Sequence, residues 1–405
     1  MRASRLIPLL TVILTGCAAL GPGGPRAGSG RVLLLGSSQG VVSVDPVDGS
    51  VVFEGSGVPS SGDWATLFRA TLDGGGTILE ARDSATGEAL SSVRVPGDLS
   101  VRVVSSDGSR VALMPPLAPG ASPWIPEPRV STTITVADPS GIDEPERFHL
   151  RGNLEPEAFS ADGNTLFLIR YLPPTSPEAY RVAALDLDDG SVSPVATGPK
   201  DIVETMSGTR LEQIASADGE MLYTLYTTQP AEYAELRHHA GRPVAFVHTL
   251  SLDEGWAHCV GLPRELWGGD PTDQAMAVSP DGARLYVVDT ARDVLAVMDT
   301  EKLTSESFEL GLPSANTPTR AAVGEDGTLF VAAGTEMVAI DPATPEITAT
   351  WATGAAVTVL GTLPDGLGVA MADRITVIEP ATGKHLRTIP SPTVEDPAYL
   401  GLLSR

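Results

Sequence analysis

The sequence predicts an all-β protein, folded as a closed β-propeller of four-stranded antiparallel blades. Three observations point to this fold class. A unit made of a strand, a tight turn and a hairpin recurs along the chain. The 405 residues include 42 glycines and 34 prolines, which suits many short strands joined by many turns. The first unit also lacks one strand, and a strand-like segment is left over at the C-terminus.

The clearest copy of the unit runs from Ala277 to Asp299. Residues 279–282, Ser-Pro-Asp-Gly, have turn chemistry, because proline presets φ, aspartate bonds its own backbone and glycine accepts a positive φ. Residues 285–288 and 294–298 are apolar runs of strand length on either side of a short polar break. They predict two neighbouring strands of one blade.

The turn that closes this hairpin recurs along the whole chain. Its spacing is close to the roughly 40 to 50 residues of a four-stranded blade, and radial repetition lets one domain reach this length. The count favours eight blades, with seven as the alternative if the compressed second unit forms no sheet of its own. The turns begin near residues 45, 83, 138, 186, 252, 299, 341 and 379.

The two ends of the repeat region complement each other. The first unit begins at residues 32–35 with no innermost strand before it, and residues 398–403 have a strand's composition with no hairpin after them. We therefore expect the C-terminal strand to complete the N-terminal blade. Such closure removes the open sheet edges that invite aggregation.

The N-terminus has the features of an export signal. Arg2 and Arg5 precede an apolar run at residues 6–14, which is shorter than the roughly 20 residues that span a bilayer. The run ends in Leu-Thr-Gly-Cys at residues 14–17, which resembles the lipobox of bacterial lipoproteins. The resemblance implies cleavage before Cys17, which then carries acyl chains and holds the protein on a lipid bilayer. The alternative is an ordinary secretory signal with a chance cysteine.

These features divide the chain into three parts. Residues 1–16 are the lipoprotein signal peptide, and residues 17–30 are the lipidated cysteine and a flexible tether rich in glycine and proline. Residues 31–405 are a single propeller domain. We therefore expect an extracytoplasmic protein that is lipid-anchored to the cell membrane.

One repeat resembles a known family. The Ser-Pro-Asp-Gly turn at 279–282, followed after three residues by Tyr-Val-Val-Asp at 286–289, is similar to the YVTN-type repeat of bacterial lactonase-like propellers. Weaker copies stand at 166–169 and 329–332, and the resemblance covers about residues 31–403. It implies the propeller fold. The family includes sugar-lactone hydrolases, quinoprotein-like subunits and non-catalytic surface proteins, and no catalytic residue is carried over from it.

The charge of the chain excludes one class of partner. The formal charge is −24, and only three lysines are present. A surface this acidic repels nucleic acid and anionic lipid headgroups. We therefore expect no nucleic-acid partner.

Long loops gather in one sector of the predicted ring. In an antiparallel blade the loop between the second and third strands shares a face with the crossing to the next blade. The insertions at residues 115–130, 171–180 and 227–243 therefore lie on one face of blades 3 to 5, with the crossings at 197–210 and 262–274. We predict that this face binds a protein or small-molecule partner; the alternative is that the loops only pack over the blades. The candidate contact residues are Trp124, Tyr171, Tyr180, Tyr233 and Trp267.

The starts of the innermost strands carry charged side chains that predict a polar, mostly acidic channel mouth on the same face. They are Glu155, Glu157, Glu212 and Arg320. A structural calcium ion at this mouth is one expectation, although no known metal-binding loop is present and solvated carboxylates are the alternative.

The chain lacks the common catalytic motifs. No Gly-x-Ser-x-Gly elbow, phosphate-binding glycine loop or His-Glu-x-x-His stands in the sequence. We therefore predict a membrane-tethered binding or scaffold module, more a binding protein than an enzyme. The alternative is a lactonase-like hydrolase, with a channel-mouth glutamate as base and Arg320 on the oxyanion.

Overall fold

The structure is a computed structural model of the chain. It describes residues 31–37, 40–56, 60–118, 127–196, 205–206, 209–227, 245–392 and 397–404. The predicted signal peptide, Cys17 and the tether lie outside these residues, as do Trp124 and Tyr233. Within the described part of the chain, no helix is long and apolar enough to cross a membrane.

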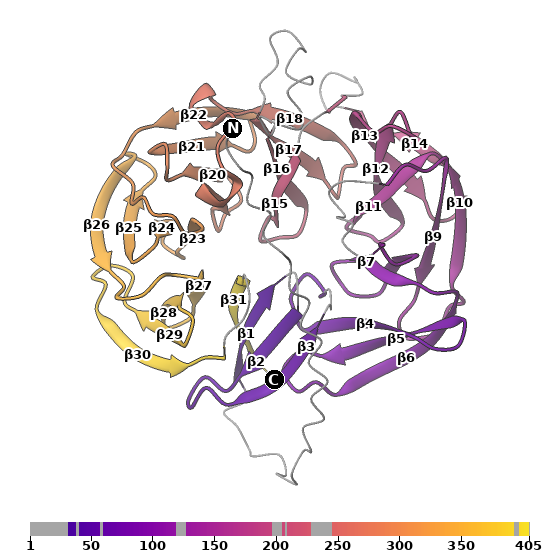
Figure 1. Cartoon of the computed structure of the whole chain (residues 1–405), viewed down its shortest axis with the longest axis horizontal. Helices are drawn as coiled ribbons and strands as arrows, with labels where there is room; N and C mark the ends of the chain where they lie inside the picture. The colour runs from indigo at the N-terminus through magenta and orange to yellow at the C-terminus, as the bar shows by residue number, and fades with distance from the viewer. Residues whose placement is uncertain are drawn as a thin grey trace, which may run out of the picture.

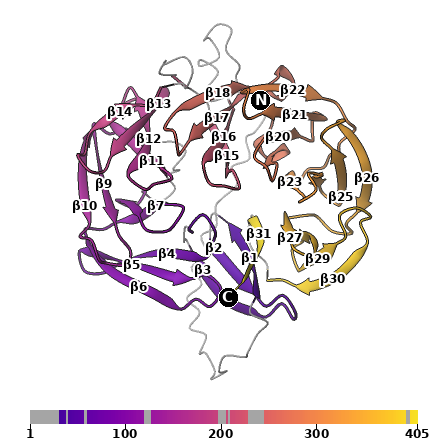
Figure 2. The ribbon, with the colours of Figure 1, turned by 180° about the vertical axis from the view of Figure 1, so that it is seen from behind.

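Eight antiparallel sheets stand as blades around a central axis, so the prediction of an eight-bladed propeller is confirmed (Figures 1 and 2). Seven sheets have four strands and one has three. From the axis outward, the strands of the first four blades are as follows. Blade 1 has β31 (Pro397–Ser404), β1 (Arg31–Ser37), β2 (Gly40–Val44) and β3 (Val51–Ser56); blade 2 has β4 (Thr66–Leu72), β5 (Gly76–Asp83) and β6 (Ala89–Pro96); blade 3 has β7 (Ser100–Val104), β8 (Val111–Met114), β9 (Ser131–Ala137) and β10 (Glu146–Arg151); blade 4 has β11 (Asn153–Phe159), β12 (Thr165–Leu172), β13 (Ala179–Asp186) and β14 (Val192–Pro194).

The remaining blades follow the same order from the axis outward. Blade 5 has β15 (Thr209–Ala215), β16 (Met221–Thr227), β17 (Ala245–Ser251) and β18 (Ala257–Gly261); blade 6 has β19 (Gln274–Val278), β20 (Arg284–Asp289), β21 (Val294–Asp299) and β22 (Thr304–Phe308); blade 7 has β23 (Arg320–Val323), β24 (Leu329–Ala333), β25 (Glu336–Asp341) and β26 (Glu346–Ala352); blade 8 has β27 (Val359–Leu363), β28 (Gly366–Ala370), β29 (Arg374–Ile378) and β30 (His385–Pro390).

The ring closes as the sequence predicts. β31 pairs antiparallel with β1, with Arg31 opposite Ser404 and Leu33 opposite Leu402, and so supplies the innermost strand of blade 1. The compressed second unit does form a sheet of its own. It has three strands, and an isolated bridge between Ser60 and Leu67 stands where the other blades have an innermost strand.

The turn between the first and second strands repeats one hydrogen-bond pattern. At blade 6, Ser279 Oγ donates to Asp281 Oδ1 over 2.6 Å and accepts the Arg284 N–H over 2.9 Å. Gly282 takes a φ of +70°, which L side chains rarely adopt. A serine two residues before the aspartate makes the same bonds in four other blades, at Ser61, Ser105, Ser160 and Ser216.

The core is divided into eight apolar clusters, one at each boundary between neighbouring blades. Side chains alternate across a strand, so one residue faces the preceding blade and the next faces the following blade. In β20, Leu285 and Val287 pack toward blade 5, whereas Tyr286 and Val288 pack toward blade 7. This arrangement explains why the middle strands are continuous apolar runs rather than alternating ones.

Candidate functional site

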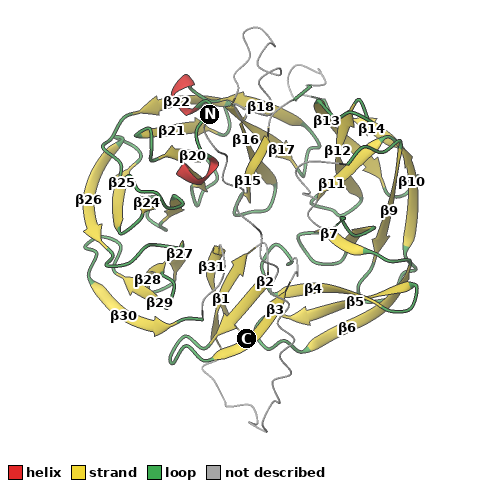
Figure 3. Ribbon diagram, viewed as in Figure 1, coloured by secondary structure: helices red, strands yellow, loops and turns green. Residues whose placement is uncertain are grey.

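The strand order places the loop-rich face at one end of the ring. The connections between second and third strands lie at this end, together with the crossings from blade to blade. Its described parts include residues 127–130 and 173–178. The crossing from blade 5 to blade 6 holds the two short 3-10 helices, η3 (Arg264–Leu266) and η4 (Pro271–Asp273) (Figure 3).

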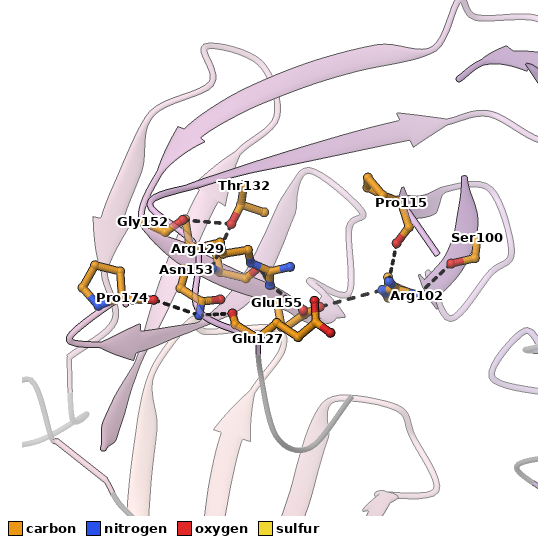
Figure 4. A network of polar contacts seen from close by, with 11 residues as sticks. Ser100, Arg102, Pro115, Glu127, Arg129, Thr132, Gly152, Asn153, Glu155 and Pro174 are labelled. Atoms are coloured by element: carbon orange, nitrogen blue, oxygen red, sulfur yellow. Dashed lines mark hydrogen bonds and ion pairs between the residues drawn. The ribbon is translucent and has the colours of Figure 1, made fainter. Parts of the chain in front are cut away.

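Glu155 lies between two arginines at the boundary of blades 3 and 4 (Figure 4). Arg129 Nη2 donates to Glu155 Oε1, and Arg102 Nε lies 3.8 Å from Glu155 Oε2. The side chains of Arg102 and Glu155 are 12% and 11% exposed. Two cations therefore meet one carboxylate, so the predicted acidic mouth is locally positive at this corner because blade 3 supplies the arginines.

Arg102 is held by its own blade as well. Its Nη1 donates to Ser100 Oγ over 2.7 Å, and its Nη2 donates to the Pro115 carbonyl oxygen over 2.6 Å. Burial lowers the pKa of Arg102, while the charge of Glu155 opposes that shift. An arginine at this site stays charged. The Nε atoms of Arg102 and Arg129 are buried and make no hydrogen bond within the described residues.

The same cluster fastens the insertion loops of blades 3 and 4 to each other (Figure 4). Asn153 Nδ2 donates to the carbonyl oxygens of Glu127 and Pro174, at 2.9 and 3.2 Å. The backbone N–H of Arg129 donates to the same Pro174 oxygen, and its side chain donates to the Leu154 oxygen over 2.7 Å. Loops in two blades thus share one set of buried polar contacts, which makes this part of the face a fixed platform.

Glu157 and Glu212 form links to the next blade instead of a free acidic rim. Glu157 is 3% exposed, and its Oε1 accepts a hydrogen bond from Gln213 Nε2 over 2.8 Å. Glu212 Oε2 accepts the Met276 N–H over 2.7 Å. Each carboxylate therefore binds a group supplied by the following blade.

The acidity of Glu212 is changed by its burial. Burial raises the pKa of Glu212 to about 7, and the Met276 N–H and the charge of Arg320 offset part of that shift. Arg320 is fixed by backbone, since its Nε donates to the Thr358 oxygen and its Nη1 donates to the Thr319 oxygen over 3.3 Å. Glu212 makes no ion pair within 4 Å to the residues that the structure describes.

The described aromatic residues of the predicted binding face are packed rather than projecting. Tyr180 is 5% exposed and stands in a series of ring contacts with Tyr171 and Tyr226 between blades 4 and 5. Trp267 donates its indole N–H to the Leu262 oxygen over 3.0 Å and packs against the cluster of blades 5 and 6. These side chains therefore fit the alternative prediction, in which the aromatic residues of the loops pack over the blades. Trp124 and Tyr233 are not described.

Sequence reasoning missed the two arginines. Arg129 stands within the predicted loop and Arg102 in the innermost strand of blade 3, but nothing in the sequence pairs them with a glutamate of the next blade. The signal available was charge: the chain has few cations, so two beside one loop are notable. For metals, no group of three or more His, Cys, Asp or Glu among the described residues could hold an ion, so the calcium site stays a prediction.

Comparisons with known proteins show where the fold recurs. No protein-family model matches the sequence, and no curated protein matches it. Solved structures do match. Apo AztD from Citrobacter koseri has a TM-score of 0.55 at 12% identity, over 92% of this chain and 97% of that chain. The chain shares the fold of this β-propeller protein.

Two other solved structures that match this fold belong to proteins of other kinds. The dihydro-heme d1 dehydrogenase NirN, in complex with DHE, has a TM-score of 0.52 at 13% identity, over 95% of this chain and 77% of that chain. A eukaryotic initiation factor has a TM-score of 0.52 at 14% identity, over 92% of this chain and 87% of that chain. One scaffold hosts unrelated functions, so the chemistry must be argued from the residues of this chain.

Proposed function

We propose that the protein is an extracytoplasmic propeller that binds a ligand or a protein partner on the loop-rich face of blades 3 to 5. The observation that carries this proposal is the cluster of Arg102, Glu155 and Arg129, which joins two insertion loops into one platform. Binding residues are commonly placed on loops held by a rigid scaffold. The shorter turns of the other blades offer no comparable platform among the described residues.

The cluster also indicates the chemistry of the ligand. Two guanidinium groups and one carboxylate leave a local charge of +1 in a chain whose formal charge is −24. Arg129 keeps a buried Nε without a hydrogen bond among the described residues, whereas Arg102 Nε faces Glu155 Oε2 over 3.8 Å. Arginine recognises carboxylate and phosphate groups through paired N–H donors. We therefore expect a ligand, or a partner side chain, that carries one of these anionic groups.

The binding test uses residues 31–405 and a panel of anions: inorganic phosphate, monocarboxylates, dicarboxylates and sugar acids. We expect at least one to raise the melting temperature in proportion to its concentration. Arg129→Met should abolish that rise, whereas Arg374→Met, which changes a half-buried arginine of blade 8, should preserve it. A rise that survives Arg129→Met in a folded variant places the anion elsewhere and contradicts the proposal.

A second readout tests for a protein partner. The folded domain is used to capture proteins from the membrane fraction of its source, and the captured proteins are compared with those of a Trp124→Ala and Tyr233→Ala double variant. These aromatic residues lie in the insertions of blades 3 and 5. A partner lost from the double variant supports the loop-rich face, and unchanged capture counts against it.

Membrane tethering through Cys17 is part of the same proposal. It rests on the lipobox-like residues 14–17 and on the short apolar run before them. Cys17→Ser in the full chain should move the protein from the membrane fraction to the soluble fraction. Mass spectrometry of the wild-type N-terminus should find an acylated Cys17. An unmodified N-terminus at another residue would contradict the anchor.

Lactone hydrolysis is a second candidate because Glu212 has a pKa of about 7 and lies within the electrostatic reach of Arg320. A carboxylate with this pKa is a suitable general base near neutral pH. Hydrolysis of a panel of sugar lactones should then rise as the pH passes through about 7, because the ionised form is required. Glu212→Gln should remove that activity. Unchanged hydrolysis in the variant would exclude Glu212 as the base.

A further inference from the structure

A large groove lies between blades 6 and 7, away from the loop-rich face. Its volume is about 1320 Å³. The turns that line it join first to second and third to fourth strands, so they belong to the end of the ring opposite the insertion loops. β21 and β22 of blade 6 form one wall, and the turn between β25 and β26 of blade 7 forms another; these blades are neighbours in Figures 1 and 2.

The groove is acidic beyond what its own cations neutralise. Six carboxylates and two cations line it, which leaves a net charge of −4 (two minus six). Both cations are already engaged by one of these carboxylates, since Arg284 and Lys302 each pair with Asp299. The other five carboxylates make no ion pair within the described residues; they are Asp281, Glu306, Glu325, Asp326 and Asp341.

Two groups of these carboxylates differ in what they bind. Asp281, Asp326 and Asp341 accept backbone N–H groups of their own turns, so their positions follow from the fold. The carboxylates of Glu306 and Glu325 make no hydrogen bond to any residue that the structure describes. Glu306 stands on β22 and Glu325 on the turn of blade 7, so they come to the groove from both blades.

Tyr286 supplies an independent sign of a ligand. It is 3% exposed, its ring packs in the cluster shared by blades 6 and 7, and it lines the groove. Its hydroxyl makes no hydrogen bond within the described part of the chain. The ring is buried, but the hydroxyl oxygen is not among the fully buried side-chain atoms, so it is open to the groove and can donate to a molecule bound there. Burial raises the pKa of Tyr286, so the phenol remains a neutral donor at physiological pH.

We propose that this groove binds an extended segment of a partner protein that carries lysine or arginine. The Tyr286 hydroxyl donates to a backbone carbonyl of the segment, and Glu306 and Glu325 pair with its cationic side chains. Size favours a peptide, because sites for small molecules measure roughly 300 to 1,000 Å³. A metal ion is disfavoured, since no three of the His, Cys, Asp and Glu residues that the structure describes form a ligand group.

The test uses residues 31–405 and a fluorescein-labelled peptide of alternating lysine and alanine, followed by fluorescence anisotropy. The same peptide with glutamate in place of lysine is the negative control. We expect the lysine peptide alone to bind, with an affinity that falls as salt is added. The double variant Glu306→Gln and Glu325→Gln should weaken binding about tenfold, and Tyr286→Phe should weaken it roughly threefold to tenfold.

A matched control separates the groove from the general charge of the protein. Glu54→Gln with Glu88→Gln makes the same charge change on exposed residues of blades 1 and 2. This variant should bind the peptide as the wild type does. Equal losses in the two double variants would mean unspecific attraction to an acidic chain and would overturn the proposal, as would no binding at all. Tyr286→Phe keeps the packed ring, so a stable Tyr286→Phe variant with unchanged affinity also counts against it.

This proposal does not depend on the loop-rich face. A photoreactive peptide should crosslink to blades 6 and 7, and crosslinks over blades 3 to 5 would assign the basic segment to the other face. Conversely, the anion panel reports on Arg129 and is unaffected by substitutions at Glu306 or Tyr286. The two binding proposals can therefore fail separately.

Discussion

Glu155 and Glu212 hold similar places in the ring but opposite electrostatic environments. Both stand in innermost strands and point toward a neighbouring blade. Glu155 meets two arginines from blade 3, whereas Glu212 meets a backbone N–H from blade 6 and makes no ion pair with the described residues. The difference shows that the groups supplied by the neighbouring blade, and not the residue type, determine whether a channel-mouth carboxylate forms ion pairs or accepts a backbone hydrogen bond.

The largest effect should follow Glu155→Gln, which leaves Arg102 and Arg129 side by side without a counter-charge. Breaking a buried ion pair in this way costs roughly 3 to 5 kcal/mol, and we expect about 3 kcal/mol because Arg129 is partly exposed. Urea unfolding measures the loss. Replacing Arg102 by Met in the same chain should recover part of it. A loss below about 1 kcal/mol would mean that the cluster contributes little to the fold.

Glu212→Gln should change the pH dependence of stability. The pKa of Glu212 is about 7 in the folded protein, against 4.5 ordinarily, so the folded state holds a proton that the unfolded chain releases. The free energy of unfolding of the wild type therefore falls as the pH rises from about 4.5 to 7, and then levels off. Across that interval the Gln variant should gain on the order of 2 kcal/mol relative to wild type, after allowance for partial exposure.

Parallel unfolding curves at pH 5 and pH 8 check this expectation. The free energy of unfolding of the variant minus that of the wild type should be larger at pH 8 than at pH 5. A difference that does not vary with pH would show that Glu212 has an ordinary pKa and would remove the ground for a general base at this position.

The smallest effect should follow Glu157→Gln, which exchanges a carboxylate for an amide at a position that accepts a hydrogen bond from Gln213. A hydrogen bond of this kind contributes about 1 kcal/mol, and Gln keeps an acceptor oxygen. We expect a loss of about 1 kcal/mol or less in urea unfolding. Because Glu157 lies two residues from Glu155 on the same strand, it is a matched control; equal losses at both positions would mean that Arg102 and Arg129 add nothing to the role of Glu155 in stability.

Sequence reasoning found the fold because the fold is repeated in local signals. The Ser-x-Asp-Gly turns and the apolar runs can be counted, and the leftover segment at 398–403 matched a first unit that began without its innermost strand. The site was harder to predict. Pairings such as Glu155 with Arg102 and Arg129 join residues of different blades, and no local pattern sets which side chains meet there. The groove around Tyr286 could not be predicted for the same reason, because residues of two blades line it. The apolar neighbours of Tyr286 in the sequence predict only a buried strand.

Two double-mutant cycles measured by urea unfolding test the central claim most directly, one for Glu155 with Arg129 and one for Glu212 with Arg320. Gln replaces each glutamate and Met replaces each arginine. We predict a coupling energy of about 2 to 3 kcal/mol for the first pair and below about 1 kcal/mol for the second. Equal couplings, or a larger one for Glu212, would contradict the claim that neighbouring blades give these two carboxylates different roles.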